Sequence, residues 1–397
     1  MAEALEFSVM MHGPTIESDM RSLLENFERE NHVKVKLTIL SWDTGWSELV
    51  KYALFHKSPD VSEIGSTWMP SLAGMDSLEP VSSARISEIG GGDAFLESIW
   101  QSALIDGQLY GIPWFADTRL IYYRRDFFAK AKLDPAQVFQ STESLSAAVE
   151  ALKDVSPATP WMVPTVKSTQ NMHIVAPWVW GAGGNFLAAD GVTILLDQPE
   201  ALLGFCNYFK LGRYLNAKTQ LNVSEVQAGF YRDQAAMVVS GTWMGMEGIS
   251  VRGLDIVKEN YGVATPPGIP FVGGSHLAIW KNTKKPELAR KLVEYLAYAD
   301  VQRGFYKTAF MLPSRNLALQ QAAPDAGDRV WQPGVAALYR GRCFPPARLW
   351  GKMEDAVSTE LGNIWAEIAA NPCDDMDQIV VKHISGVAER LKITFGG

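Results

Sequence analysis

The chain has 397 residues, of which 47% are hydrophobic and 20% are charged, a composition typical of a globular protein with two or three domains. Its formal net charge of −8 argues against a phosphate-backbone partner, so no nucleic-acid ligand is expected. No apolar run approaches the roughly 18 residues that a membrane-spanning helix needs.

The first four residues, Met1 to Ala4, are acidic and lack the apolar core of a signal peptide. We therefore expect either a cytoplasmic protein or an exported one whose signal was removed and replaced by a start Met. Three cysteines, Cys206, Cys343 and Cys373, form an odd set without CxxC spacing, so we predict buried free thiols rather than disulfides or zinc ligands. The six histidines do not cluster, and no metal or cofactor is expected.

The first forty residues predict a strand, a helix and a second strand. Residues 5–10 form a short apolar run. Met20, Leu23, Leu24 and Phe27 then recur at helical spacing. Residues 33–39 alternate between apolar and polar side chains, as a half-buried strand does. This order indicates a parallel βαβ unit with a right-handed crossover.

Strands and helices continue to alternate along the rest of the chain. Asp106-Gly107 is a two-residue hairpin signal. Three prolines within residues 265–270 exclude helix and central strand, so this segment is interpreted as a connector between lobes. The further predicted strands are 60–64, 120–123, 235–239 and 277–280, and the further helices are 46–53, 144–154, 199–214, 288–296 and much of the last 45 residues. The pattern predicts an α/β fold with open sheets.

In open α/β sheets, ligands bind beyond the carboxyl ends of the strands, and several of the 13 tryptophans lie in such positions. Aromatic faces beside polar groups suit sugars, which present flat C–H faces and many hydroxyls. The candidates are Trp42, Trp68, Trp114, Trp178, Trp243 and Trp350. Core positions are expected instead for Trp100, Trp161, Trp280, Trp331 and Trp365.

Polar residues accompany these tryptophans. Asp43 follows Trp42, and Asp117 and Arg119 follow the predicted hairpin, where either a surface ion pair or a place in the ligand cleft is possible. Gly274 and Ser275 precede His276, and the glycine would permit close approach of the backbone to a ligand. A structural role is expected for His276 itself.

Several motifs, taken in order, resemble the family 1 extracellular solute-binding proteins of ABC importers, of the maltodextrin-binding type. The resemblance covers nearly the whole chain, and the order and spacing of its motifs are more specific than any one of them. The matching stretches are 59–61 with 65–68, 106–113 with 120–124, 235–238 with 241–243, 273–275 and 312–315.

The resemblance implies a two-lobed periplasmic-binding-protein-like (Venus-flytrap) fold with a ligand cleft between the lobes. One lobe would take residues 1–112 and 272–315, and the other 113–271 and 316–397. Trp68 then matches a stacking residue of the first lobe, Trp243 and Trp350 match stacking positions of the second, and Trp178 lies near a loop that completes the pocket.

By the same resemblance, the chain would capture a mono- or oligosaccharide and deliver it to the membrane permease of an ABC transporter. It would act as a monomer in the periplasm or at the cell surface, without catalysis. Two alternatives remain. A glycoside hydrolase would need two positioned carboxylates, and no local motif pairs them. The same fold could also bind a non-sugar solute such as a polyamine, through an aromatic box with several carboxylates.

Overall fold

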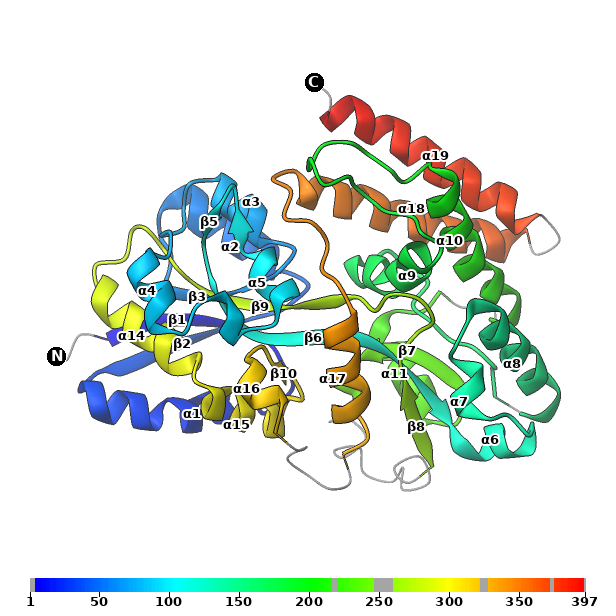
Figure 1. The fold of residues 1–397 in the computed structure, drawn as a ribbon, viewed down its shortest axis with the longest axis horizontal. Helices are drawn as coiled ribbons and strands as arrows, with labels where there is room; N and C mark the ends of the chain where they lie inside the picture. Colours follow the sequence, from blue (N-terminus) through cyan, green and yellow to red (C-terminus); the bar gives the residue numbers. More distant parts are fainter. Residues whose placement is uncertain are drawn as a thin grey trace. The chain divides into compact units, whose positions relative to one another are not determined.

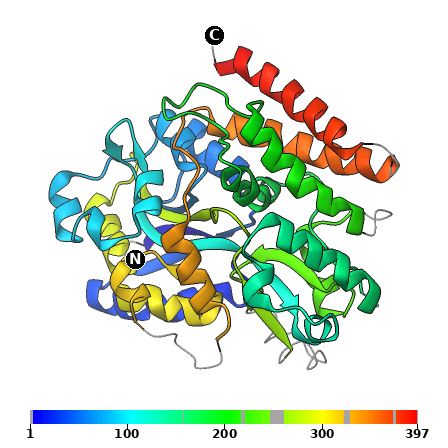
Figure 2. The same ribbon diagram turned by 45° about the vertical axis from the view of Figure 1, so that its right-hand side comes forward.

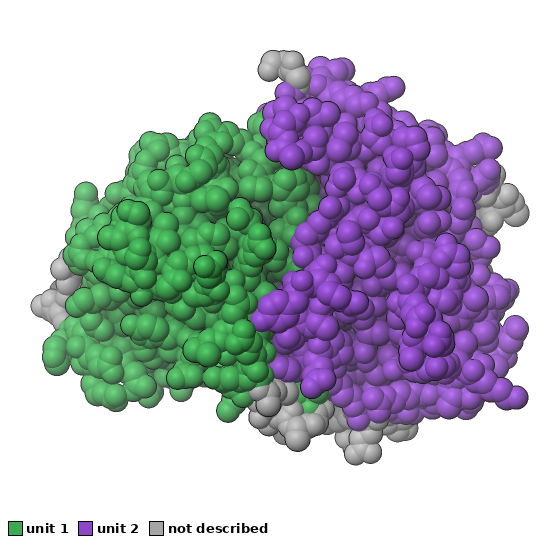
Figure 3. Space-filling view, in the orientation of Figure 1, with its two compact units in different colours: residues 1–117, 272–328, 343–351 green, residues 118–271, 329–342, 352–397 purple. Residues whose placement is uncertain are grey.

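The computed structural model describes residues 4–156, 158–215, 220–245, 260–321, 328–371 and 375–395. Two compact units make up the fold, coloured separately in Figure 3. Unit 1 comprises Met1–Asp117, Val272–Asp328 and Cys343–Gly351, and unit 2 comprises Thr118–Phe271, Arg329–Arg342 and Lys352–Gly397. The lobe boundaries expected at 112, 271 and 315 stay a prediction; Trp350, expected in the second lobe, belongs to unit 1 in this division.

Unit 1 is built on a mixed sheet in the order β10-β6-β9-β3-β1-β2 (Figure 1). β1 pairs in parallel with β2 and with β3, which confirms the predicted βαβ start. β9 and β10 are antiparallel to their neighbours β3 and β6. The strands are β1 (Ala4–Met10), β2 (Lys34–Leu40), β3 (Val61–Gly65), β6 (Ile112–Arg124), β9 (Val272–Ile279) and β10 (Leu312–Pro313).

The first helix, α1 (Ile16–Asn31), forms because its apolar residues share one face. Of the residues predicted to share this face, Met20, Leu24 and Phe27 are buried and Leu23 is half-buried; Ile16 at the start of the helix is also buried. The helix ends at His32, whose left-handed backbone lets its N–H donate to the carbonyl of Glu28.

The remaining helices of unit 1 are short or moderate in length. They are α2 (Gly45–Phe55), α3 (Met69–Gly74), α4 (Ser83–Glu88), η1 (Gly92–Ala94), α5 (Glu97–Ser102), α14 (Pro286–Leu296), α15 (Ala299–Ala309) and α16 (Asn316–Leu319). β4 (Leu104–Ile105) and β5 (Gln108–Leu109) form the predicted hairpin. Asp106 and Gly107 turn it with φ of 51° and 79°, the left-handed conformations of a type I′ turn.

β6 is longer than the sequence indicated. Residues 113–119, expected to form a loop, belong with 120–124 to one strand of 13 residues. That expectation was wrong because Pro113 and Asp117 are typical loop residues, although β6 is buried along almost its whole length. Within unit 2, β7 (Met237–Gly241) and β8 (Tyr261–Ala264) pair antiparallel to the end of β6.

Helices make up most of unit 2. α9 and α10 pack closely because Gly204 faces the backbone of Val179, where an added Cβ would lie 2.4 Å from its Cα. The helices are α6 (Arg125–Lys130), α7 (Pro135–Val138), α8 (Thr142–Val155), α9 (Thr169–Gly181), α10 (Pro199–Phe209), η2 (Lys210–Tyr214), α11 (Val223–Tyr231), α17 (Trp331–Arg340), α18 (Trp350–Ala370, whose first two residues belong to unit 1) and α19 (Met376–Phe395).

The last helix, α19, runs beside α18 and packs on α10 (Figure 2). Its predicted apolar stripe is confirmed, since Ile384, Val387 and Leu391 are buried. Within the described ranges, no helix is long and apolar enough to cross a membrane.

Two further expectations concern residues outside these elements. The segment 265–270 contains neither helix nor strand, as its prolines predict, and the chain passes to unit 1 just after it, at Val272. Cys206 is a buried free thiol, whereas Cys343 is free but only half-buried; Cys373 lies outside the described residues.

Candidate ligand-binding site

Unit 1 carries an aromatic cluster at the carboxyl ends of its parallel strands. Trp42 follows β2, Trp68 follows β3, and Trp46 lies in the first turn of α2. The ring of Trp68 lies 5.5 Å from that of Trp42 and 5.9 Å from that of Trp46, centroid to centroid. Trp42 remains 39% exposed, and the other two are half-buried. We call these three residues the unit 1 aromatic face.

A buried contact between Glu63 and His12 supports this face from behind. Glu63 of β3 is fully buried and accepts a hydrogen bond from the N–H of Met10 over 2.7 Å. Its other oxygen lies 2.9 Å from Nε2 of His12. The His12 ring in turn contacts the edge of Trp42, with centroids 5.6 Å apart. Glu63 thus fixes the loop after β1, and His12 fixes the orientation of Trp42.

Gly274 and Ser275 lie in β9, beside this region. Gly274 has φ of 148°, and a Cβ added there would lie 2.2 Å from the carbonyl oxygen of Phe115. The close backbone approach that the sequence predicted for a ligand is therefore taken up by β6. Ser275 is fully buried and pairs with Gly65, the last residue of β3.

In unit 2, Arg119 of β6 is the centre of a second cluster. Its guanidinium carbon lies 4.8 Å from the centroid of the Trp243 ring and 5.6 Å from that of Phe271. Trp243 follows β7 and is half-buried. The guanidinium is thus held over two aromatic faces, a geometry that arginine favours.

His173 of α9 completes what we call the Arg119 cluster, which comprises Arg119, His173, Trp243 and Phe271. Its ring stacks on Phe271 with centroids 4.3 Å apart and an interplanar angle of 7°. Nε2 lies 3.5 Å from a carboxylate oxygen of the buried Glu354. Burial first, and then the charge of Arg119, hold the pKa of His173 well below its usual range, so the ring is neutral at pH 7.

Two predicted site residues, Trp114 and Trp178, are buried against other aromatic side chains. Trp114 is fully buried and packs on Phe305, with stacked rings 5.0 Å apart. Trp178 is 2% exposed and packs edge to face against Trp161 and Tyr208. The structure corrects the placement of Trp114, which belongs to a strand rather than a loop. Trp178 lies in the last turn of α9, next to the loop that follows this helix, as the sequence placed it.

The other candidates take varied positions. Trp350 is 1% exposed and stacks on Phe344, with centroids 4.5 Å apart. Asp43 is exposed beside Trp42, and its N–H donates to the hydroxyl of Ser41. Asp117 is half-buried at the last position of unit 1 before the chain enters unit 2.

The tryptophans expected in the core are mostly there. Trp161, Trp280, Trp331 and Trp365 are at most 3% exposed. Trp100 is half-buried and stacks on Phe95.

Sequence reasoning missed three contributors. Trp46 was assigned only to a helix face, and His173 and Glu354 lie in helices far apart in the chain. A histidine within an apolar helix was the available signal for His173. Among the described residues, no group of three or more His, Cys, Asp or Glu side chains could hold a metal ion.

Residues 13–303, well over half of the chain, match the family described as bacterial extracellular solute-binding protein. The chain therefore belongs to this family of bacterial solute-binding proteins.

Relatives and solved structures agree with this assignment. The chain is 26% identical to the diacetylchitobiose binding protein DasA of Streptomyces coelicolor, covering 80% of this chain and 77% of DasA. It is 24% identical to the maltodextrin-binding protein MdxE of Bacillus subtilis, covering 78% and 73%. The fold is shared with maltose-bound MalE3 of T. maritima, at a TM-score of 0.82, 18% identity and coverage of 98% and 100%. Sugar-binding MalE of Xanthomonas citri matches with a TM-score of 0.80, 22% identity and coverage of 99% and 98%.

Proposed function

We propose that this protein is the sugar-capturing receptor of an ABC importer. The observation that carries the proposal is the unit 1 aromatic face, three tryptophans at the carboxyl ends of parallel strands with Trp42 open to solvent. Such faces stack on the C–H surfaces of sugar rings, while nearby polar groups bind hydroxyls. The names of DasA and MdxE, which specify diacetylchitobiose and maltodextrin, support the same ligand class.

In unit 2, the Arg119 cluster would supply the complementary chemistry. Trp243 offers a second aromatic surface, and Arg119 can donate to hydroxyls from a guanidinium already oriented by His173. Asp43 and Asp117 would add carboxylate acceptors. Gly274, Ser275 and Trp350 stay in the proposal as residues that shape the site.

The receptor would bind its sugar without chemical turnover and pass it to a membrane permease. Binding without catalysis fits a family of solute-binding proteins. We further propose that the protein acts as a monomer in the periplasm or at the cell surface, in keeping with the extracellular description of the family.

Calorimetry with a carbohydrate panel that includes maltose, maltodextrins and diacetylchitobiose tests this function. We expect one site per chain and recovery of the unchanged sugar by chromatography after long incubation. Release of hydrolysed product would make the protein a glycoside hydrolase. Binding of spermidine but of no sugar would assign it a non-sugar solute.

The aromatic residues are tested by Trp68→Ala and Trp243→Ala. Each change should weaken sugar binding by about 2–4 kcal/mol, as expected for buried aromatic anchors. Phe55→Ala in unit 1 and Tyr339→Ala in unit 2 remove exposed aromatic rings outside the two clusters and should leave the affinity unchanged. Unchanged affinity in the two Trp variants, with the folded state intact, would refute the proposed contacts.

A further inference from the structure

Arg342, which follows α17 in unit 2, is a half-buried arginine without a carboxylate partner. Its Nη2 donates to Oδ1 of Asn185 over 2.7 Å and lies 3.5 Å from the carbonyl oxygen of Gly184. Its guanidinium carbon lies 4.3 Å from the centroid of the Trp180 ring, and Trp180 is 4% exposed. In the part of the chain that the structure describes, no Asp or Glu forms an ion pair with Arg342.

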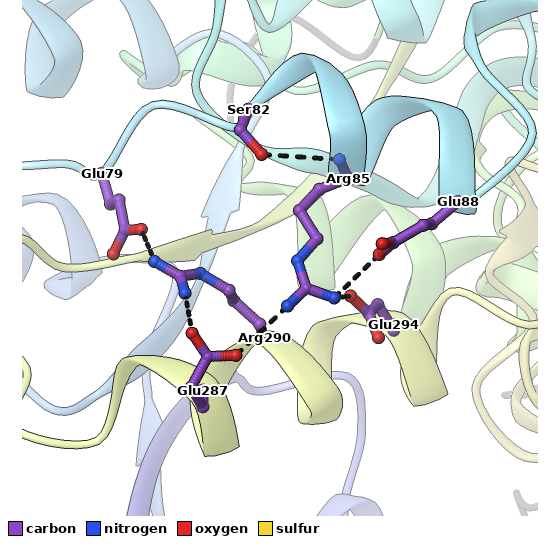
Figure 4. Close-up of polar contacts among 7 residues, drawn as sticks. All are labelled: Glu79, Ser82, Arg85, Glu88, Glu287, Arg290 and Glu294. Atoms are coloured by element: carbon purple, nitrogen blue, oxygen red, sulfur yellow. Dashed lines mark hydrogen bonds and ion pairs between the residues drawn. The ribbon is translucent and has the colours of Figure 1, made fainter.

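Other arginines of the protein show how a guanidinium is usually accommodated. In unit 1, Arg85 and Arg290 each contact two or more glutamates (Figure 4). In unit 2, the buried Arg124 of β6 pairs with two aspartates. A charge withdrawn from water costs free energy unless an opposite charge accompanies it. Burial alone, without a compensating carboxylate, lowers the pKa of Arg342 to about 10, so the side chain still carries its charge at pH 7.

The sequence explains why no carboxylate accompanies this charge. Three segments of unit 2 meet at Arg342: α9 with the loop after it, the Pro-rich segment before β9, and the end of α17 with the two residues that follow. The backbone N–H of Arg342 donates to the carbonyl of Pro270, which joins the last two segments. The chain has 44 acidic residues, yet none falls within 155–189, 260–271 or 329–342. Glu354, which comes soon after the third segment, contacts His173 of the Arg119 cluster.

The Arg342 side chain has hydrogen-bond donors that remain unused. Its Nε is buried and has no hydrogen-bond partner. Its Nη1 makes no hydrogen bond to any residue within the described ranges. Asn185 uses its amide oxygen to accept from Arg342, so its NH2 group lies next to the guanidinium as a further donor. Both side chains are half-buried and can be reached from solvent. A positive charge with several free donors and no acidic neighbour favours an anion that offers two or more oxygens.

We propose that Arg342 and Asn185 form an oxyanion-binding site, for a phosphate, sulfate or carboxylate group. The group would accept from the guanidinium and from the NH2 of Asn185, while Trp180 supports the guanidinium from one face. It would supply the negative charge that the surrounding segments lack, and it would link the loop after α9 to the end of α17. The site is separate from the Arg119 cluster, because Trp180 follows His173 by seven positions in α9, about 10 Å along the helix axis. The proposal does not depend on sugar binding.

Sulfate is the first probe, titrated at constant ionic strength into the intact protein. The readout is the NMR signal of the Asn185 side-chain amide. We expect a saturable shift with sulfate and with phosphate. Dimethyl sulfone, a neutral molecule of similar shape, should bind at least about tenfold more weakly, because charged hydrogen bonds are lost. No saturable shift with any oxyanion, or equal binding of dimethyl sulfone, would overturn the proposal.

A second series identifies the source of the oxyanion. Glucuronate and glucose differ by one carboxylate, and the same amide signal compares them. Glucuronate binding more tightly than sulfate and phosphate would assign the site to a sugar acid. The reverse order would assign it to inorganic oxyanions.

Variants test whether the bound group meets Arg342. Arg342→Met keeps an apolar chain over Trp180 but should abolish the sulfate-dependent shift of Asn185. Asn185→Asp places a carboxylate beside the guanidinium. It should raise the thermal unfolding midpoint by about 2–4 °C without sulfate and remove the further rise that sulfate gives the unaltered protein.

Arg213→Met is the matched control. Arg213 also lies over an aromatic ring in unit 2, with its guanidinium carbon 5.6 Å from the Tyr214 centroid, but it is exposed. This variant should keep the full response to sulfate. A sulfate shift retained in Arg342→Met would contradict the site. If Arg342→Met does not fold, Asn185→Asp decides, and a midpoint that responds to sulfate as in the unaltered protein overturns the proposal.

Discussion

Arg119 donates a hydrogen bond from Nη2 to Nδ1 of His173 over 2.8 Å. Because Nδ1 accepts this bond, the proton of the neutral imidazole must lie on Nε2, which faces Glu354. One contact between a strand and a helix thus sets both the tautomer of the histidine and the direction of the guanidinium.

Replacing Arg119 with Met should change both the pKa of His173 and the affinity for sugar. The charge of Arg119 lowers the pKa of His173, so the pKa should rise in the variant, although burial, the larger cause, keeps it below the usual value. On the proposed function, sugar affinity should fall about tenfold or more, because a charged donor is lost. Histidine NMR titration and calorimetry measure the two effects. Arg232→Met, at an exposed position in the same unit, should change neither, and an unchanged affinity in Arg119→Met would remove Arg119 from the site.

Acid should destabilise the protein in part through His276. Burial lowers the pKa of this histidine to about 4, despite a hydrogen bond from Nε2 to the carbonyl of Ile99. In the unfolded chain this histidine binds a proton near pH 6.5. The stability that comes from keeping it neutral is therefore complete above pH 6.5 and is lost as the pH falls toward 4. The loss reaches about 3 kcal/mol at pH 4. His276→Gln should flatten urea-unfolding stability between pH 6.5 and 4. The control is His56→Asn, at an exposed residue with a left-handed backbone, which should leave the slope of unfolding free energy against pH unchanged. If His276→Gln has the same slope as the unaltered protein, other groups cause the loss of stability in acid.

Gly274→Ala should destabilise unit 1 by about 2–3 kcal/mol, because the new methyl group would clash with the backbone of Phe115 at a φ unfavourable for alanine. Gly304 is the control, since it lies in the exposed middle of α15 with no atom within 4 Å of an added Cβ. Gly304→Ala should stabilise the protein by up to about 1 kcal/mol. Thermal unfolding midpoints compare the two variants with the unaltered protein. An unchanged midpoint for Gly274→Ala would show that β6 moves to accommodate the methyl group.

Glu63→Gln should cost about 1–3 kcal/mol of stability. Glu63 accepts from both Met10 and His12, and an amide would turn one of these contacts into two opposed donors. Urea unfolding measures the loss, with Glu25→Gln as the exposed control. On the proposed function, sugar affinity should also fall in Glu63→Gln, since His12 orients Trp42. A stable variant with full affinity would show that the loop after β1 does not depend on these two hydrogen bonds.

Local sequence patterns predicted most of the elements, because periodicity and turn chemistry act over a few residues. Phe27 at the end of its helical face and Asp106-Gly107 in its hairpin are examples. Trp114 could not be placed in this way. Its neighbours Pro113 and Asp117 are typical of loops, and only the pairing of β6 with distant strands makes this segment a strand.

The candidate site was predictable where a tryptophan lies within three residues of a strand end, as Trp42, Trp68 and Trp243 do. It was not predictable where a side chain reaches the site through tertiary packing. His173 and Glu354 are 181 positions apart by their numbers, and neither has a local pattern that signals the other. Trp46 is a contrasting case, since its place on a helix face hid its contact with Trp68.

The strand order of unit 1 has a consequence for the newly made chain. β9, which lies between β6 and β3 in the sheet, is synthesised more than 200 residues after β3. At the usual rate of synthesis, about 5–20 residues per second, β9 leaves the ribosome roughly 10–40 s after β3, and one edge of β3 has no partner strand in that time. Until then the first unit cannot close its sheet, so β3 has an unpaired edge to which another strand could pair wrongly.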